Sequence, residues 1–88
     1  MPEFSVEVSS QVEKDLRGVP RNLRNRIIRG IEFLAENPFP RQSLKLSGGD
    51  RAYRLRVGDY RVIYEVNLGE RVVAVFAVRH RRDAYRRR

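Results

Sequence analysis

Residues 53–66 of this chain, YRLRVGDYRVIYEV, have the pattern of two strands joined by a two-residue turn, and they decide the fold. Apolar and polar side chains alternate on both sides of Gly58-Asp59, which is typical of an antiparallel hairpin with one buried face. With these residues in the turn, Arg56 lies opposite Arg61, and directly opposed side chains share a face. The apolar face then comprises Tyr53, Leu55, Val57, Tyr60, Val62 and Tyr64. The other face gathers Arg54, Arg56 and Arg61.

Three arginines on one face of a short hairpin are unfavourable by themselves. Two cations directly opposite each other destabilise a sheet by a few tenths of a kcal/mol up to ~1 kcal/mol. A phosphate group between them reverses the sign, because the planar guanidinium group matches phosphate oxygens. We therefore expect an anion site at Arg54, Arg56 and Arg61. The alternative is a solvated basic face that Glu65 partly neutralises.

Two helices are expected before the hairpin. The stretch Ser10-Gln11-Val12-Glu13 matches an S-x-x-E capping box, so a short helix should begin there and end near Gly18. Pro20 suits the first turn of a second helix, which Asn37-Pro38 should end. The apolar stripe of this helix comprises Leu23, Ile27, Ile28, Ile31 and Leu34. Gly30 within it costs ~1 kcal/mol relative to alanine and indicates a site of close packing.

Four strands are expected, at residues 3–8, 51–57, 60–66 and 71–78, with a short extended piece at Ser43–Leu46. The order β-α-α-β-β-β predicts an α+β fold in which two N-terminal helices pack on one face of a small curved, mainly antiparallel sheet. The last strand, VVAVFAV, is apolar at both parities, so it should be central or covered on both faces. We expect one domain, residues 1–88, with a basic C-terminal segment at 79–88.

The net charge of +8 is unevenly distributed along the chain. Residues 1–40 contain six basic and six acidic side chains, whereas residues 41–88 contain thirteen basic and five acidic ones. This asymmetry favours a nucleic acid or phosphate as partner, and the alternative is an acidic protein. The sequence has no cysteine, apolar leader or membrane-length apolar run. A cytoplasmic protein without a metal site or cofactor is therefore expected.

The segment RHRRDAYRRR, residues 79–88, can fold back over the open face of the sheet. Tyr85 can stack on a base, a contact of ~1–3 kcal/mol that tolerates any sequence. Histidine is a common general acid or base, so His80 is a candidate for a chemical role, although a histidine beside arginines is more often a plain surface group. With arginine, tyrosine and one histidine, the expected chemistry is phosphoryl transfer on a substrate that carries its own nucleophile. RNA qualifies through its 2′-OH.

The segments LKLSGGDRAYRLRVGDYRVIYEV (44–66) and VVAVFAVRHRRDAY (72–85), together with the order of elements, resemble the RelE/ParE superfamily of toxin–antitoxin toxins. The resemblance covers essentially the whole chain. Similarity to RelE-type toxins implies a ribosome-dependent mRNA interferase that cuts mRNA in the A site and leaves a 2′,3′-cyclic phosphate. It also implies a cognate antitoxin, expected to be acidic, that wraps the toxin. Operator DNA is then bound only through the toxin–antitoxin complex.

The resemblance also implies which residues act. Carried over position by position, the catalytic residues are Arg54, Arg56, Arg61, Arg81 and Tyr85. We expect contacts to RNA or the ribosome from Lys45, Arg51, His80, Arg82 and Arg86.

Arg54 and Arg56 depart from the RelE pattern, which has lysine at these positions. Lysine loses a proton when it is desolvated and arginine does not, so charge stabilisation carries over but a general-base role does not. Ser47 stands where the family often has a basic residue. The general base is then Tyr85, His80 or no residue. Two other hypotheses stay open: a ParE-type inhibitor of DNA gyrase on the same fold, and an inactive homologue that acts only in a repressor complex.

Overall fold

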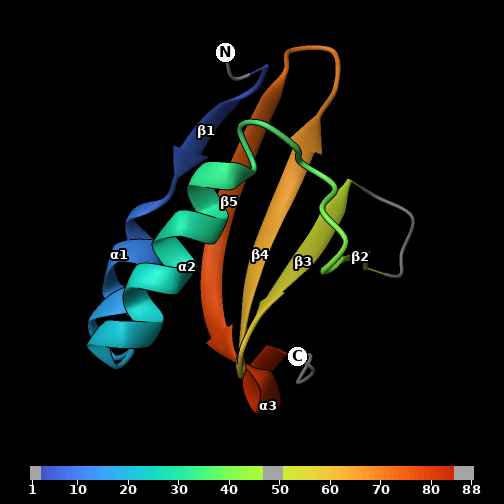
Figure 1. The fold of residues 1–88 in the computed structure, drawn as a ribbon. Helices are drawn as coiled ribbons and strands as arrows, with labels where there is room; N and C mark the ends of the chain where they lie inside the picture. Colours follow the sequence, from blue (N-terminus) through green and yellow to red (C-terminus); the bar gives the residue numbers. More distant parts are fainter. Residues whose placement is uncertain (1–2, 47–50, 85–88) are drawn as a thin grey trace.

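The structure, a computed structural model, describes residues 3–46 and 51–84 of the chain (Figure 1). Within these residues, five strands form one sheet in the spatial order β1-β5-β4-β3-β2. The strands are β1 (Ser5–Val8), β2 (Ser43–Lys45), β3 (Ala52–Val57), β4 (Tyr60–Asn67) and β5 (Val72–His80). The helices are α1 (Ser10–Arg17), α2 (Arg21–Phe33) and α3 (Arg81–Ala84). Among the described residues, no helix has both the length and the apolar character that a membrane crossing needs.

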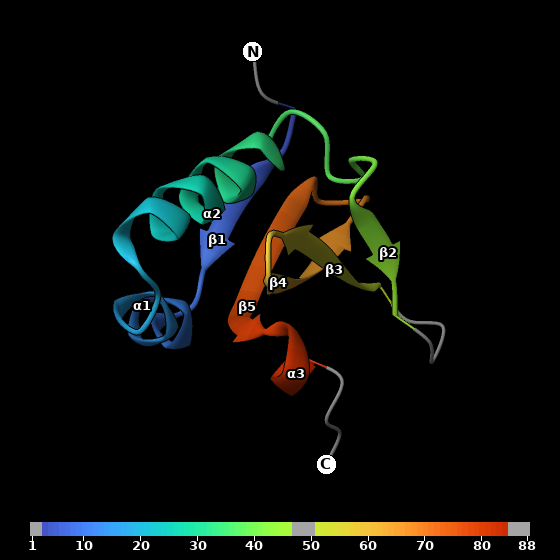
Figure 2. The same cartoon turned by 60° about the horizontal axis from the view of Figure 1, so that its bottom comes forward.

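The two N-terminal helices lie on one side of the sheet (Figure 1 and Figure 2), as the order of elements predicts. Neighbouring strands are antiparallel except β1 and β5, which run parallel. The expected α+β fold is therefore confirmed. Two elements add to the order β-α-α-β-β-β: the edge strand β2, within the extended piece expected at Ser43–Leu46, and the short helix α3, which the sequence pattern does not predict.

The hairpin of β3 and β4 has the register that its turn predicts, with Val57 opposite Tyr60 and Arg56 opposite Arg61. Gly58 has a φ of 59°, a left-handed conformation that costs glycine little because it has no Cβ. The apolar face of the hairpin forms part of the core. Its buried members are Leu55, Val62 and Tyr64, and Tyr53, Val57 and Tyr60 pack against them.

Tyr64 has the largest fully buried side chain of the described core. Its hydroxyl donates a hydrogen bond of 2.8 Å to the carbonyl oxygen of Pro38, in the loop after α2. Its ring stacks on Tyr53 with 5.8 Å between centroids, and Tyr53 contacts Phe39 at 5.1 Å. Burial raises the pKa of Tyr64 from 10.0 to about 12. The central strand thus fixes the course of the loop that leads from α2 to β2.

Helix α2 approaches β3 closely at Gly30. A Cβ at this position would lie 3.4 Å from Leu55 Cδ2 and 3.5 Å from Val57 Cγ2, so the helix backbone itself reaches the sheet side chains. These are ordinary van der Waals distances, so an alanine would fit at this position and the approach of the helix does not require glycine. The predicted stripe also faces the core, with Ile27, Ile31 and Leu34 buried and Leu23 and Ile28 half-buried.

The capping box predicted at Ser10 is wrong. Helix α1 has Ser9 as its N-cap, and no side chain caps the helix. The Ser9 hydroxyl donates instead to the carbonyl oxygen of Phe76 at 2.9 Å, and the Ser9 N–H donates to that of Val75 at 3.0 Å. After β1 the chain continues along the edge of β5. The Ser9 hydroxyl is therefore engaged by a carbonyl oxygen of β5 and is not available to cap α1.

Helix α1 continues to cover the edge of β5 after β1 has ended. The carboxylate of Asp15 accepts a hydrogen bond of 2.9 Å from the Val78 N–H and one of 2.6 Å from the Arg79 guanidinium. Asp15 therefore satisfies a strand N–H that the short β1 does not reach, which an uncovered sheet edge would leave to solvent.

Strand β5 is an interior strand, between β1 and β4, as the first of the two expected alternatives has it. The second alternative is wrong, because Phe76 on the open face is 43% exposed. A register shift opposite Ile63 and Tyr64 marks a β-bulge in β5. The bulge changes the parity of the strand, so Val73, Val75 and Val78 are all buried on one face. The bulge thus explains why Val78 is buried although it differs in parity from Val73 and Val75.

Candidate functional site

Four arginines line one hollow on the face of the sheet opposite the helices. Arg54 and Arg56 come from β3 and Arg61 from β4, as strand parity predicts. Arg41 joins them because β2 pairs with β3: Leu44 lies opposite Arg54, and the Arg56 N–H donates to the Gln42 carbonyl oxygen at 3.2 Å. We call Arg41, Arg54, Arg56 and Arg61 the arginine cluster; its hollow has a volume of about 490 Å³.

Sequence reasoning missed Arg41. It lies in the loop between α2 and β2, and nothing in its local pattern separates it from other surface arginines. The expected extended piece at Ser43–Leu46 was the one available signal, because its pairing with the hairpin would have brought Arg41 beside Arg56.

Arg61 is the fixed member of the arginine cluster. It is only 8% exposed, and its guanidinium donates to the carbonyl oxygens of Gly58 at 3.1 Å and Tyr60 at 3.0 Å. Within the described residues these bonds are to neutral carbonyls, and no carboxylate forms an ion pair with Arg61. A poorly hydrated, uncompensated cation attracts an anion more strongly than an exposed one, because the effective dielectric constant around it is lower.

The other members differ in exposure. Arg54 is half-buried, whereas Arg41 and Arg56 are exposed. Arg56 lies at the edge of β3 and lines a second hollow, between α2 and β3, in addition to that of the arginine cluster. The arrangement combines one rigid guanidinium with two that can adjust to a ligand, which suits a phosphate group held by several donors.

Helix α3 brings the predicted C-terminal arginines to the hairpin turn. The Arg81 N–H donates to the Asp59 carbonyl oxygen at 2.7 Å, so the start of α3 is fixed against the turn (Figure 2). Arg81 and Arg82 are both exposed at this end of the sheet. The structure thus brings Arg81 to the same end of the hairpin as Arg56 and Arg61, although by backbone contact alone.

His80 does not share the face of the arginine cluster. It lies opposite Tyr60 in the β4–β5 pairing, and the two rings meet edge to face with 5.4 Å between centroids. Its Nδ1 accepts a long hydrogen bond of 3.4 Å from the Arg82 N–H. These contacts place His80 on the face of the sheet that carries the apolar hairpin residues. There its side chain contacts the first turn of α3.

Lys45 and Arg51 also lie apart from the arginine cluster. Lys45 is opposite Tyr53, next to the pair formed by Leu44 and Arg54. Successive side chains of a strand point to opposite faces, so Lys45 lies on the face away from the arginine cluster. Both residues line a separate hollow with Phe39, Tyr53 and Leu68. The predicted residues Tyr85 and Arg86, and also Ser47, lie outside the described residues.

The chain is similar to known toxins along almost its whole length. A family model described as the ParE toxin of the type II toxin–antitoxin system parDE matches residues 6–85. The chain belongs to the RelE/ParE superfamily of toxins. A relative is the candidate toxin RelE1 of Methanocaldococcus jannaschii, 33% identical over 96% of this chain and 97% of the relative.

Solved structures share the fold of this RelE/ParE toxin. RelE in the RelE–RelB complex from Pyrococcus horikoshii is 32% identical, with a TM-score of 0.77 over 90% of this chain and 96% of that chain. The RelB–RelE complex from Methanococcus jannaschii gives 30% identity and a TM-score of 0.74, over 90% and 94% of the two chains. A shared fold does not determine function, so the target must be argued from the site.

Proposed function

We propose that this toxin is a ribosome-dependent endoribonuclease that cleaves mRNA in the A site and thereby inhibits translation. The arginine cluster carries the proposal, because Arg54, Arg56 and Arg61 from adjacent strands line one hollow on the open face of the sheet. An RNA backbone offers closely spaced phosphates, which several guanidinium groups in one hollow can bind together. The RelE relatives support the RNA-cleaving branch of the superfamily over the others.

The chemistry that the arginine cluster suits is attack by a 2′-OH on the adjacent phosphorus. The O2′–P bond forms while the bond from phosphorus to the 5′ oxygen of the next nucleotide breaks, which yields a 2′,3′-cyclic phosphate and a 5′-hydroxyl. Negative charge increases in the transition state, and guanidinium groups around it stabilise that charge without metal. Arg61 is already held by two carbonyl oxygens, so it needs little reorganisation.

The proton of the 2′-OH needs an acceptor other than arginine. Arg54 and Arg56 keep their protons in a protein, so we assign them, with Arg81, to charge stabilisation. His80 faces Tyr60 on the other side of the sheet, which favours Tyr85 or no residue as the base. Weak acid–base assistance forfeits ~10²-fold or more in rate. Alignment of the RNA by the ribosome would then be essential.

The proposed partners are mRNA, the ribosome and a cognate antitoxin in the cytoplasm. The RelE relatives from Pyrococcus horikoshii and Methanococcus jannaschii were solved with RelB, which supports an antitoxin for this chain. The net charge of +8 favours an acidic antitoxin, since complementary charge promotes association. Contact with operator DNA would be made only through the complex of the two proteins.

The test is to induce the chain in cells and map mRNA 5′ ends within translated codons. We expect codon-phased cuts and growth arrest from the wild type, and a loss of ~10²-fold or more in cleavage from Arg54→Ala/Arg56→Ala, because charge stabilisation in the transition state is lost. The matched control is Arg17→Ala/Arg21→Ala, which removes two exposed arginines of the helices. Full cleavage by the Arg54/Arg56 variant would overturn the assignment.

A second candidate function is inhibition of DNA gyrase, which the match to the ParE toxin model favours. The same induced protein should therefore be assayed for inhibition of gyrase supercoiling. Inhibition without codon-phased cuts would establish the ParE-type activity, whereas cuts without inhibition would establish the RNase.

A further inference from the structure

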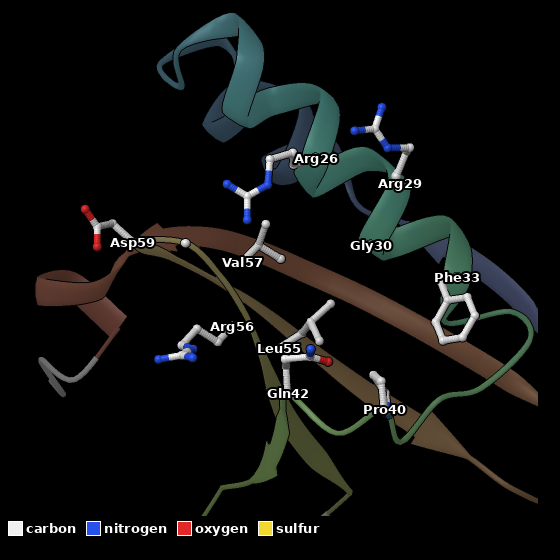
Figure 3. A pocket seen from close by; sticks show the side chains of 11 residues that line it. Arg26, Arg29, Gly30, Phe33, Pro40, Gln42, Leu55, Arg56, Val57 and Asp59 are labelled. Carbon is white, nitrogen blue, oxygen red and sulfur yellow. The ribbon is translucent and has the colours of Figure 1, made fainter.

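The hollow between α2 and the end of β3 adjoins the hollow of the arginine cluster. Arg56 and Gln42 line both of them, and the pairing of β2 with β3 stops one residue before Arg56. An extended ligand bound at the arginine cluster can therefore continue past Arg56 to the helix side. We call the hollow on that side the α2–β3 groove; its volume is about 740 Å³, and its helix wall carries Arg26, Arg29 and Phe33 (Figure 3).

The α2–β3 groove continues the positive charge of the arginine cluster. Arg26 and Arg29 are exposed and lie three residues apart on α2, where side chains are neighbours and like charges repel. The Arg26 guanidinium points towards the hairpin turn, and its Nη1 atom would lie 3.8 Å from a Cβ at Gly58 (Figure 3). Among the described residues that line the groove, Asp59 is the only acid, and it forms no ion pair with these arginines. Positive charge on both sides of Arg56 favours a polyanion that reaches both hollows.

The remaining walls of the α2–β3 groove suit unpaired nucleotides. Leu55 and Val57 form an apolar floor, and Phe33 is 51% exposed at the end near Pro40 (Figure 3). An exposed aromatic ring is a stacking platform for any base, because every base has a π-face. A duplex keeps its bases inside its own stack, whereas a single strand presents them to such a ring. The occupant that matches basic edges, an apolar floor and one aromatic ring is therefore single-stranded RNA.

We propose that a single-stranded RNA bound at the arginine cluster continues past Arg56 into the α2–β3 groove. There Arg26 and Arg29 bind phosphates that flank the cleaved one, and Phe33 stacks on a base. The groove is thus a second subsite for the same strand, and binding there follows at high effective concentration once the first phosphate is held. This subsite rests on the proposed function, because it takes the substrate of the arginine cluster. It makes the affinity depend on how far the strand extends beyond the cleaved phosphate.

The test compares a short and a long single-stranded RNA, of about four and about eight nucleotides, by fluorescence anisotropy on the full chain without ribosomes. Both RNAs carry 2′-O-methyl groups, so no hydroxyl can attack. The length gain is the affinity for the long RNA divided by that for the short one. We expect Arg26→Glu/Arg29→Glu to have a length gain at least about tenfold smaller than Arg17→Glu/Arg21→Glu, because attraction of the flanking phosphates becomes repulsion. The second variant changes the net charge equally outside the groove. Equal length gains would overturn the subsite.

An uncharged substitution tests the stacking contact. Phe33→Ala leaves the net charge unchanged and should reduce the length gain at least about fivefold, whereas Phe33→Tyr, which keeps a ring, should preserve it. An unchanged length gain in Phe33→Ala would overturn the stacking contact.

The short RNA separates failure of the subsite from failure of the proposed function. If Arg54→Ala/Arg56→Ala weakens binding of the short RNA while the two charge variants have equal length gains, the subsite alone is refuted. If Arg54→Ala/Arg56→Ala leaves binding of both RNAs unchanged, the arginine cluster is not an RNA site, and the proposed function falls together with the subsite.

Discussion

The side chain of Tyr64 both fills the core of this toxin and holds the loop after α2 in place. Its ring fills the core beneath the helices, and its hydroxyl bonds to the carbonyl oxygen of buried Pro38. A buried carbonyl that loses its donor costs about 1–3 kcal/mol, because it has also lost water. The position of the chain that leads to Arg41 therefore depends on a hydroxyl on the far side of the sheet.

The raised pKa of Tyr64, about 12 against 10.0, predicts a loss of stability in alkali. Below pH 10 the hydroxyl is protonated in both the folded and the unfolded chain, so its contribution is fully present. Between pH 10 and 12 the unfolded chain ionises first, and the free energy of unfolding falls by on the order of 2 kcal/mol. Urea unfolding at pH 9 and pH 11 measures the first part of this fall, roughly 1.3 kcal/mol. Tyr64→Phe should be less stable at pH 9 and should fall less between the two pH values; an equal fall would refute this origin.

At the scale of elements, the hairpin was predictable and its neighbours were not. The Gly58-Asp59 turn and strict alternation fix the register of β3 and β4 locally, so the faces of Arg54 and Arg61 follow from the sequence. The position of Arg41 and the hydrogen bond of the Ser9 hydroxyl depend on contacts with strands that come much later in the chain. The bulge at Phe76 has no local signal either, because apolar residues on both sides of it are equally consistent with two buried faces.

The contact between α1 and β5 yields a prediction of its own. Asp15→Ala removes the acceptor of both the Val78 N–H and the Arg79 guanidinium, and Asp15 is only 11% exposed. We expect the free energy of unfolding to fall by roughly 1–3 kcal/mol. Native-state hydrogen exchange should speed up at the Val78 amide more than at amides of β4. Asp15→Asn keeps one acceptor and should lose less; equal losses would show that the helix–strand contact does not depend on this acceptor.

For the molecule as a whole, the basic second half of the chain governs encounters with polyanions. All of the net charge of +8 lies in residues 41–88, whereas the helical half is neutral. Under the proposed function, an RNA approaches the open face of the sheet, because Arg41, Arg54, Arg56 and Arg61 line one hollow there. The net charge of the sequence favours a polyanionic partner in general, whereas the fold shows on which face of the sheet the arginines gather.

Binding of a short single-stranded RNA should accordingly be strongly dependent on salt. The logarithm of the association constant should fall linearly with that of salt concentration, with a slope that decreases by roughly 0.7 for each phosphate contact removed. Arg54→Ala/Arg56→Ala should lower the slope accordingly, whereas Arg17→Ala/Arg21→Ala should leave it unchanged. Fluorescence anisotropy over a salt series makes the comparison. The same slope in both variants would contradict a phosphate site at the arginine cluster.

The parallel pairing of β1 with β5 also sets an order in time. β1 precedes its partner strand, Val72–His80, by more than sixty residues in the chain and is therefore synthesised before it. The helices can form early from local contacts, but the sheet cannot close until residue 80 has left the ribosome. The strand pairing that completes the core beneath the arginine cluster therefore comes last. A chain that has been synthesised only as far as β4 therefore cannot complete the five-stranded sheet.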